Sequence, residues 1–211
     1  MKRQIVVVTA SFFVSLGLMS VFSSPAIATE TYKVDPVHSA AVFRIKHLGI
    51  AYVYGRFNDL SGTLKIDDQT PANSQVELSV MTKNVDTFNS ERDDHLRSPD
   101  FFDSKKFPIM SFQSKSFTKV SKDMYEVTGD LAIHGVTRPL TVQAQHTGAG
   151  KDPWGGFRIG FETTFTIRRS DFGMDFMMEG VGDEVRIILS IEGIRKETIT
   201  ALTVRAAVER A

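Results

Sequence analysis

A strictly alternating segment at residues 157–167 constrains the fold of this chain more than any other feature of its sequence. Every second position is a large apolar residue or a threonine: Phe157, Ile159, Phe161, Thr163, Phe165 and Ile167. Successive side chains of a β-strand point to opposite faces, so this segment has one apolar face and one polar face. The pattern recurs in residues 76–80 and 127–133, and in residues 185–192 with Ile188 as the exception. Together these segments predict an antiparallel sheet that closes around an apolar interior.

Residues 1–28 have the features of a signal peptide rather than of a folded domain. Lys2 and Arg3 precede an apolar stretch from Ile5 to Phe22, and Ala26-Ile27-Ala28 has the small–x–small pattern that signal peptidase cuts. Hydroxyl side chains dilute the apolar stretch, which argues against an uncleaved anchor: Thr9, Ser11, Ser15 and Ser20. We therefore expect cleavage after Ala28, a periplasmic location, and no stable membrane insertion of the mature protein.

The composition after residue 28 is that of a nearly neutral single domain. The whole chain has 25 basic and 25 acidic residues, and removal of Lys2 and Arg3 leaves 23 basic residues against the same 25 acidic ones. This balance argues against nucleic acid or an anionic membrane surface as the main partner. The chain has no cysteine, so no disulfide stabilises it. About 183 residues are enough for one domain with a substantial core.

Runs of alternating residues separated by turn signals predict a mostly β domain. The predicted strands lie near residues 31–35, 38–48, 52–58, 61–67, 74–82, 108–120, 123–133, 138–147, 156–169 and 183–194. Glycines such as Gly55 and the Gly148-Ala149-Gly150 run are interpreted as bends, bulges or turns. With this number of strands, an eight-stranded or slightly larger barrel is wide enough to hold one slender ligand.

Residues 89–103 break the strand pattern and predict a helical insertion. Ser90 to Asp93 resembles a capping box, and Ser98-Pro99-Asp100 resembles a second helix start with proline in the first turn. We expect two short helices whose apolar side chains turn inward: Leu96, Phe101 and Phe102. Residues 195–211 form a C-terminal extension that is either a short helix or a tail.

No sequence pattern for catalysis or metal binding stands out. The five histidines form no HxxxH or HxH pair, and the chain contains no P-loop, GxGxxG or GxSxG motif. Asp93-x-His95 could be a ligand or acid/base pair, but a surface helix with solvated charges explains it as well. His47 shares the inward face of its strand with Phe43 and Ile45, where it is either a core histidine or part of a site. We therefore predict no catalytic residue, no metal and no cofactor.

Several motifs follow one another in a familiar order from about residue 31 to residue 194. The opening motifs are Tyr32-x-Val34-Asp35-x-x-His38-Ser39, Phe43-x-Ile45-x-His47-Leu48-Gly49 and Gly55-x-Phe57. The later motifs are Val85-Asp86-Thr87, Arg92-Asp93-x-His95-Leu96-x-Ser98, Asp100-Phe101-Phe102-Asp103, Gly129-x-Leu131-x-Ile133-x-Gly135-Val136-Thr137-x-Pro139, Arg169-x-Asp171-Phe172-Gly173 and Val181-Gly182-x-x-Val185. In these motifs the chain resembles the YceI-like family. The resemblance implies an all-β, extended, antiparallel eight-stranded lipocalin-like barrel at residues 29–194, with a short helical insertion. It also implies a polyisoprenoid or similar long-chain amphiphile in the pore.

The sequence thus predicts a periplasmic protein that binds, transports or sequesters a prenyl pyrophosphate, an isoprenoid quinone or a related lipid. The predicted pore-lining residues are Phe43, Val80, Met110, Phe112, Phe161, Phe165, Leu189 and Ile191. The predicted headgroup ligands are His47, Arg92, His95 and Arg169, all in the family-like motifs. For the two arginines, ion pairs with Asp86, Asp93 or Asp171 that hold the fold are an equally good interpretation.

Other functional classes stay open at this point. A stress- or adhesion-related interaction module would have the same strands around a simply packed core, and a lipid-modifying enzyme is a further alternative. A homodimer formed through a sheet edge or face is also an option.

Overall fold

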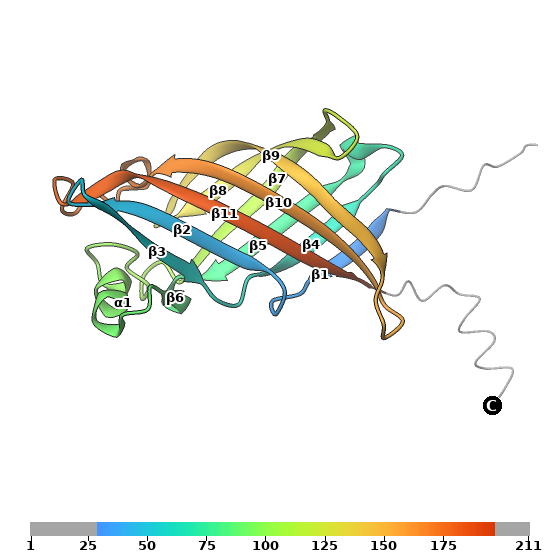
Figure 1. Cartoon of the computed structure of the whole chain (residues 1–211). Helices are drawn as coiled ribbons and strands as arrows, with labels where there is room; N and C mark the ends of the chain where they lie inside the picture. The colour runs from blue at the N-terminus through green and yellow to red at the C-terminus, as the bar shows by residue number, and fades with distance from the viewer. Residues whose placement is uncertain (1–28, 197–211) are drawn as a thin grey trace, which may run out of the picture.

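The strands of the protein wind into an elongated barrel in a computed structural model that describes residues 29–196 (Figure 1). The predicted signal peptide and most of the C-terminal extension lie outside these residues. The strands are β1 (Glu30–Val34), β2 (Ala40–His47), β3 (Ala51–Phe57), β4 (Ser61–Ile66), β5 (Gln75–Met81), β6 (Val85–Asp86), β7 (Ile109–Lys119), β8 (Met124–Ile133), β9 (Val136–Lys151), β10 (Phe157–Arg168) and β11 (Val181–Arg195). One α-helix, α1 (Ser90–Arg97), and three short 3₁₀ helices, η1 (Pro71–Asn73), η2 (Thr82–Asn84) and η3 (Arg169–Phe172), complete the described part.

The strands form one closed, antiparallel barrel of eight positions. The sheet order is β1-β4-β5-β7-β8-β9-β10-β11-β2-β3-β6, and an additional pairing of β1 with β11 closes it. β1 and β2 both pair with β11, one after the other, so they occupy a single position that is interrupted between them. β4 and β3 then pair with β1 and β2 in the same way, and β5 and β6 pair with β4 and β3. The predicted all-β, eight-stranded fold with a helical insertion is therefore confirmed.

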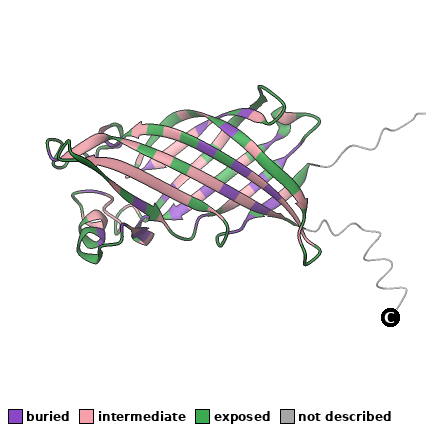
Figure 2. Cartoon of the chain, viewed as in Figure 1, coloured by how far each residue is buried: buried purple, intermediate pink, exposed green. Residues whose placement is uncertain are grey.

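The strand register places the alternating apolar residues on the inner wall. Phe161 pairs with Ile191, and Val80 pairs with Met110, with all four side chains buried. On β10, the residues that alternate with the inward-facing positions are exposed: Glu162, Thr164 and Thr166. Figure 2 shows how buried and more exposed residues succeed one another along the strands. The exception noted in the sequence, Ile188, points outward and is partly exposed.

The two ends of the barrel differ. At the end where the described chain begins and finishes, Tyr32 pairs with both Leu64 and Arg195. Tyr32 and Leu64 are among the most deeply buried side chains, and Phe117 and Tyr125 are buried in the same core, with ring centroids 5.1 Å apart. The opposite end carries the β2–β3 hairpin, the residues 169–180 loop and the α1 segment (Figure 1). We call this second end the mouth.

The helical insertion differs from the prediction in two respects. Asn89, not Ser90, is the N-cap of α1, because its side chain accepts a hydrogen bond from the backbone N–H of Arg92 at 2.9 Å. The second predicted helix is absent from the described chain: Ser98 ends α1, and the residues that follow form turns, with Phe101 N–H donating to Ser98 O and Asp103 N–H to the same oxygen. Phe102 nevertheless turns inward as expected and packs edge-on against Phe57, with centroids 5.3 Å apart.

Three glycines that were interpreted as bends, bulges or turns lie within strands. Gly148 and Gly150 lie within β9, which pairs with β10 from Ala144 to Lys151, so β9 is longer than predicted. Gly55 lies inside β3 directly opposite Phe43, where a Cβ atom would come within 2.4 Å of the Phe43 ring. The glycine therefore makes room for an aromatic ring of the inner wall. Within residues 29–196, no helix combines the length and hydrophobicity needed to cross a bilayer.

Candidate functional site

The barrel encloses a cavity of about 410 Å³. Its wall is formed by apolar side chains from β2, β3, β4, β5, β7, β8, β9, β10 and β11, together with the α1 segment. Deep in the barrel the wall is almost wholly hydrocarbon, with Thr163 as a polar member whose hydroxyl donates to Gln143 O at 2.8 Å. Since that donor is already satisfied, the inner part of the cavity suits an apolar chain rather than a polar metabolite.

All eight predicted pore-lining residues lie on this wall. They come from β2, β5, β7, β10 and β11: Phe43, Val80, Met110, Phe112, Phe161, Phe165, Leu189 and Ile191. Phe161 lies toward the inner end, where its ring is 6.1 Å from that of Tyr125 and 5.3 Å from that of His146. The alternation predicted which face of each strand turns inward, and the barrel brings these faces together.

The polar part of the wall is concentrated at the mouth, where Thr87 connects Arg92 to Asp93. The Arg92 guanidinium donates from Nε to the Thr87 hydroxyl at 2.7 Å and from Nη2 to the Thr87 carbonyl at 2.6 Å. Thr87 in turn donates from its hydroxyl and from its backbone N–H to the buried Asp93 carboxylate, at 2.5 and 2.8 Å. Arg92 is exposed and lines the cavity, and within residues 29–196 its Nη1 forms no hydrogen bond and no ion pair.

The two predicted histidines also lie on the mouth side of the cavity. His95 on α1 stacks edge-on against Phe101 and Phe176, with centroids 5.1 and 5.5 Å away, and its Nε2 contacts Asp100 Oδ2 at 2.9 Å. His47 is the last residue of β2 and is exposed where it borders the cavity. The suggested Asp93–His95 pair is not formed, because Asp93 binds Thr87 and His95 binds Asp100.

Arg169 is on the cavity wall but is already engaged by backbone. It is 3% exposed, and its three side-chain nitrogens donate to the carbonyls of Gly182, Met174 and Val181 at 2.9, 2.7 and 2.8 Å. Burial lowers the pKa of this guanidinium, while the charges of Asp183 and Asp175 oppose that effect. Neither Arg92 nor Arg169 forms the ion pairs with Asp86, Asp93 or Asp171 that the sequence left open, among the described residues. Arg169 instead ties the mouth loop to the start of β11.

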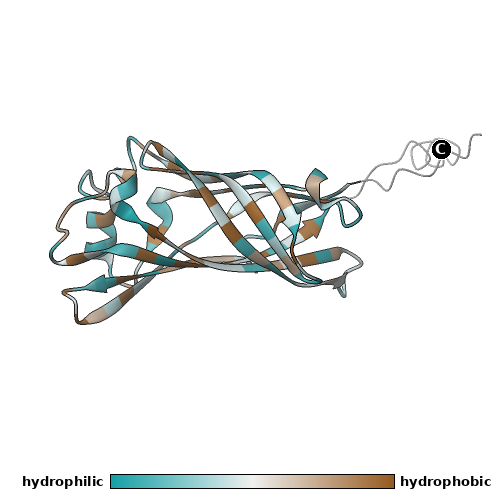
Figure 3. Cartoon of the chain, turned by 90° about the horizontal axis from the view of Figure 1, so that it is seen from above, coloured by the Kyte–Doolittle hydropathy of each residue, from teal (hydrophilic) through white to brown (hydrophobic). Residues whose placement is uncertain are grey.

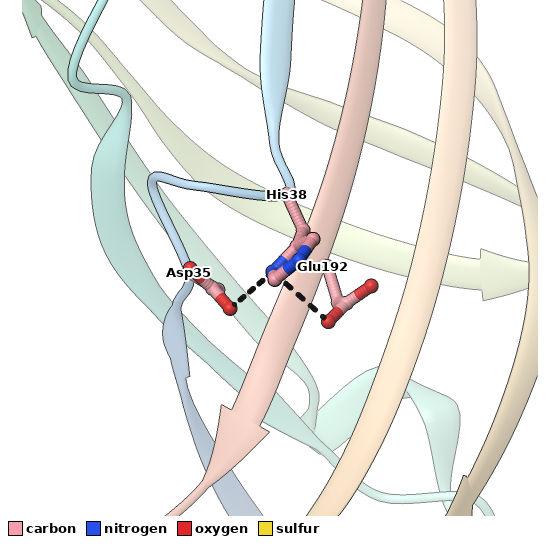
Figure 4. A group of neighbouring side chains, drawn as sticks. All are labelled: Asp35, His38 and Glu192. Carbon is pink, nitrogen blue, oxygen red and sulfur yellow. Dashed lines mark hydrogen bonds and ion pairs between the residues drawn. The ribbon is translucent and has the colours of Figure 1, made fainter. Parts of the chain in front are cut away.

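A second polar cluster lies on the outside of the barrel, where β1 passes into β2. Asp35 Oδ2 is 2.8 Å from His38 Nδ1, and His38 is 3.8 Å from Glu192 on β11 (Figure 4). Arg158 on β10 donates to Asp35 and Asp152 at 2.8 Å each and also to Glu192. Ser39 and the backbone of Glu192 exchange two further hydrogen bonds.

This cluster holds the seam of the barrel together. Asp35, His38 and Glu192 are the one group of described residues close enough together to hold a metal ion, but Arg158 already supplies positive charge to both carboxylates. The hydrogen bond from His38, followed by that from Arg158, lowers the pKa of Asp35 to about 2 against the opposing effect of burial. The sequence motif around Asp35 and His38 gave no sign of this cluster, because Glu192 and Arg158 are far away along the chain.

Sequence reasoning also missed some residues at the mouth. Thr87 is 2% exposed and organises Arg92, yet a lone threonine after a short strand carries no sequence signal for that role. Met174 and Met177 line the cavity from the residues 169–180 loop, where no strand alternation indicates an inward side.

Comparison with known protein families and sequences gives consistent matches over the barrel. Residues 32–193 match the YceI-like domain. A UPF0312 protein of Pseudomonas aeruginosa is 41% identical over 184 residues, which cover 86% of this chain and 95% of the relative. A UPF0312 protein of Yersinia pestis is 42% identical over 183 residues, covering 86% and 94%.

Solved structures share the same architecture. The YceI protein of Campylobacter jejuni is 32% identical, with a TM-score of 0.65. The match covers 72% of this chain and 90% of the Campylobacter jejuni chain. BcnA of Burkholderia cenocepacia is 24% identical, with a TM-score of 0.69, and the match covers 75% of this chain and 98% of BcnA. A polyisoprenoid binding domain from Saccharophagus degradans has a TM-score of 0.63 at 16% identity and covers 78% and 98%. The last two matches establish a common fold only.

Proposed function

The chain belongs to the YceI-like domain family, and on that premise we propose that it binds one long-chain polyisoprenoid, or a similar amphiphilic lipid, inside the barrel. The observation that carries the proposal is the cavity of about 410 Å³, whose inner wall is apolar and whose polar groups gather at one end. That distribution matches a molecule with a long hydrocarbon tail and one polar headgroup. The fold shared with a polyisoprenoid binding domain supports the same ligand class.

The tail alone can supply most of the affinity. Burial of a CH₂ group contributes about 0.8 kcal/mol, so one five-carbon isoprene unit that leaves water for the cavity contributes about 4 kcal/mol at most. The loss of translational and conformational freedom on binding offsets part of this gain. Affinity should therefore rise with tail length until the inner wall around Phe161 is covered.

Headgroup recognition falls to the residues at the mouth. Arg92 is the main candidate, because its exposed guanidinium borders the cavity and its Nη1 remains available for a pyrophosphate or carbonyl oxygen. His95 and His47 lie on the same side and can add a hydrogen bond. We assign Arg169 a supporting role, because its donors already hold the mouth loop.

A binding role explains the site better than catalysis does. Asp93 and His95, which the sequence suggested as an acid/base pair, bind different partners and do not form that pair. A periplasmic carrier or scavenger, secreted after cleavage at Ala28, is the role that we propose. An interaction module with a simply packed core does not account for a cavity of this size in the barrel.

The proposal is tested by asking what the protein carries and how tail length affects binding. The protein as processed by its host is purified without detergent, and native mass spectrometry together with organic extraction identifies bound molecules. Isoprenoid alcohols of increasing length are then titrated into delipidated protein. We expect a co-purified lipid at one per chain and an affinity that rises with length before it reaches a plateau. No lipid and no length dependence would favour the packed-core module, while turnover of the added lipid would point to an enzyme.

A further inference from the structure

The mouth of the cavity is bordered by large apolar side chains that are exposed. Ile50 at the tip of the β2–β3 hairpin is 80% exposed, and next to it Leu48 is 54% exposed. Met177 and Met178 on the residues 169–180 loop are also exposed. We call these four residues the rim. Figure 3 shows hydrophobic segments at the loops of this end of the barrel.

The rim is a single patch that continues into the cavity. Leu48 N–H donates to Gly180 O at 2.7 Å, and a Cβ atom at Gly180 would touch both Met177 and Leu48. Met177 also lines the cavity. Leu48 and Met177 both have positive φ, 52° and 56°, a conformation that costs free energy for residues other than glycine. The fold thus holds two large apolar side chains in a strained conformation where they meet water, and such strain clusters at functional sites.

A basic and aromatic face adjoins the rim on the outside of β2, β3 and β11. Of the outward-facing pairs, Lys46 with Tyr52 is nearest the hairpin tip, and Arg44 pairs with Tyr54 and with Arg186 in the next outward-facing row. The Tyr52 ring lies under both cations, 4.2 Å from the Arg44 guanidinium carbon and 4.7 Å from Lys46 Nζ. We call Arg44, Lys46, Arg186, Tyr52 and Tyr54 the basic face.

The positive charge of the basic face is not balanced within the described part of the chain. Among residues 29–196, no carboxylate forms an ion pair with Arg44, Lys46 or Arg186, and Arg44 Nε has no hydrogen-bond partner. Glu184 lies on the same side of β11, but the register places it opposite Arg168. The overall charge balance of the sequence had argued against an anionic membrane as the main partner, and the fold shows that the charges are unevenly distributed.

Together, the rim and the basic face have the arrangement of a membrane-interface surface. Each pair of strand residues advances about 7 Å, so the tip, the Lys46–Tyr52 row and the Arg44–Tyr54 row lie at successive depths. Apolar side chains at a tip can enter the boundary between headgroups and acyl chains, while tyrosines and cations match the headgroup layer. The residues 169–180 loop contributes Met177 and Met178 to the rim but also carries Asp175 and Glu179, so we expect the β2–β3 side of the mouth to make most of the contact.

We propose that the rim and the basic face dock the protein on a bilayer that carries anionic headgroups, with the cavity mouth turned toward the lipid. The passage of an isoprenoid between bilayer and cavity rests on the function proposed above, whereas the docking itself does not. The contact is peripheral, because the rim consists of only four side chains and the loop that carries Met177 and Met178 also carries Asp175 and Glu179.

Vesicle co-sedimentation tests the docking. The protein as processed by its host is mixed with vesicles of phosphatidylglycerol and phosphatidylethanolamine, and with phosphatidylcholine vesicles as the neutral comparison. We expect preferential binding to the anionic vesicles. Ile50→Asp should lower the partition coefficient at least tenfold, and Lys46→Gln and Arg186→Gln about fivefold each, since a cation near an anionic surface contributes about that factor.

Matched variants at the other end of the barrel serve as controls. Val120→Asp places the same charge at an exposed apolar turn residue, and Lys122→Gln removes a cation from the same turn. Both should bind anionic vesicles like the parent protein. Absence of binding to anionic vesicles, equal losses for variants at both ends, or a dimer in solution that Ile50→Asp dissociates would overturn the proposal.

A separate measurement distinguishes a failure of the docking from a failure of the isoprenoid binding proposed above. A short, water-soluble fluorescent isoprenoid is titrated in the absence of vesicles. Ile50→Asp and Lys46→Gln should bind it like the parent protein but extract a long isoprenoid from vesicles more slowly. If the parent protein docks as predicted but binds no isoprenoid, the docking stands and the proposed ligand is wrong.

Discussion

Phe161 offers the sharpest test of whether the barrel interior is a binding cavity. The residue is 7% exposed, and its ring contacts Tyr125 and His146 on one side while it borders the cavity on the other. A phenylalanine packed on all sides costs about 3–5 kcal/mol of unfolding free energy when it is replaced by alanine. Because part of the Phe161 ring already faces empty space, fewer contacts are lost, and we expect Phe161→Ala to cost about 2–3 kcal/mol.

Phe172 provides the matched control. It is 3% exposed, belongs to the same hydrophobic core, and does not line the cavity. Phe172→Ala should therefore cost the full range of about 3–5 kcal/mol, and bound lipid should not compensate for the loss.

Urea denaturation of the delipidated parent protein and variants, with and without a long isoprenoid alcohol, measures the loss of unfolding free energy on mutation and the stabilisation by the ligand. A ligand present at one hundred times its dissociation constant stabilises a folded protein by about 2.7 kcal/mol. We expect the Phe161→Ala variant to gain at least as much from the ligand as the parent protein, because the ligand can occupy the space that the ring leaves. The reasoning fails if Phe161→Ala costs as much as Phe172→Ala and the ligand stabilises neither the parent protein nor the variant.

The remaining predictions concern the polar clusters. Asp35, whose pKa is lowered from 3.8 to about 2, contributes stability that is present above pH 4 and lost as the pH falls toward 2. Arg158→Gln should therefore be destabilised at pH 7, and its deficit relative to the parent protein should shrink across that window in acid denaturation; a constant deficit would contradict the assignment. Thr87→Val should cost about 1–3 kcal/mol in thermal unfolding, because the buried Asp93 loses the hydroxyl that donates to it. Arg92→Ala should weaken a prenyl pyrophosphate more than an isoprenoid quinone of equal tail length in titrations, and equal effects on both would leave the headgroup site unassigned.

Much of the fold was accessible from local patterns. The alternation in β10 and β11 correctly assigned Phe161 and Ile191 to the inner wall, because a strand has a fixed two-residue period whatever its neighbours are. The errors arose where local signals conflict with tertiary pairing. Gly148 and Gly150 have the composition of a turn, but the backbone of β10 is available to pair with them. Ser98-Pro99 has the composition of a helix start, but the chain there turns to bring Phe101 and Phe102 inward.

The candidate site was less predictable than the fold. The sequence identified Arg92 and Arg169 as candidate headgroup ligands and left ion pairs that hold the fold as an equally good interpretation for both. The two guanidinium groups have different environments. Arg169 donates to one carbonyl of its own loop and to two at the start of β11, whereas the side chain of Arg92 donates, among the described residues, to Thr87 alone and leaves Nη1 available. Which carbonyls lie within reach of a guanidinium is decided by the path of the backbone, and residue spacing does not encode that path.

The sequence by itself determined that this protein is a β-barrel with an apolar interior, because strand periodicity and side-chain polarity are local properties. Only the tertiary structure decided that the interior is hollow, since the space left between opposite walls depends on the diameter of the closed sheet. It also decided that Asp35, His38, Arg158 and Glu192 form one cluster at the barrel seam, because the pairing of β1, β10 and β11 brings together charges that lie more than 100 residues apart. The same pairing gathers Arg44, Lys46 and Arg186 on one face, so a chain that is neutral overall acquires a basic surface beside its apolar rim.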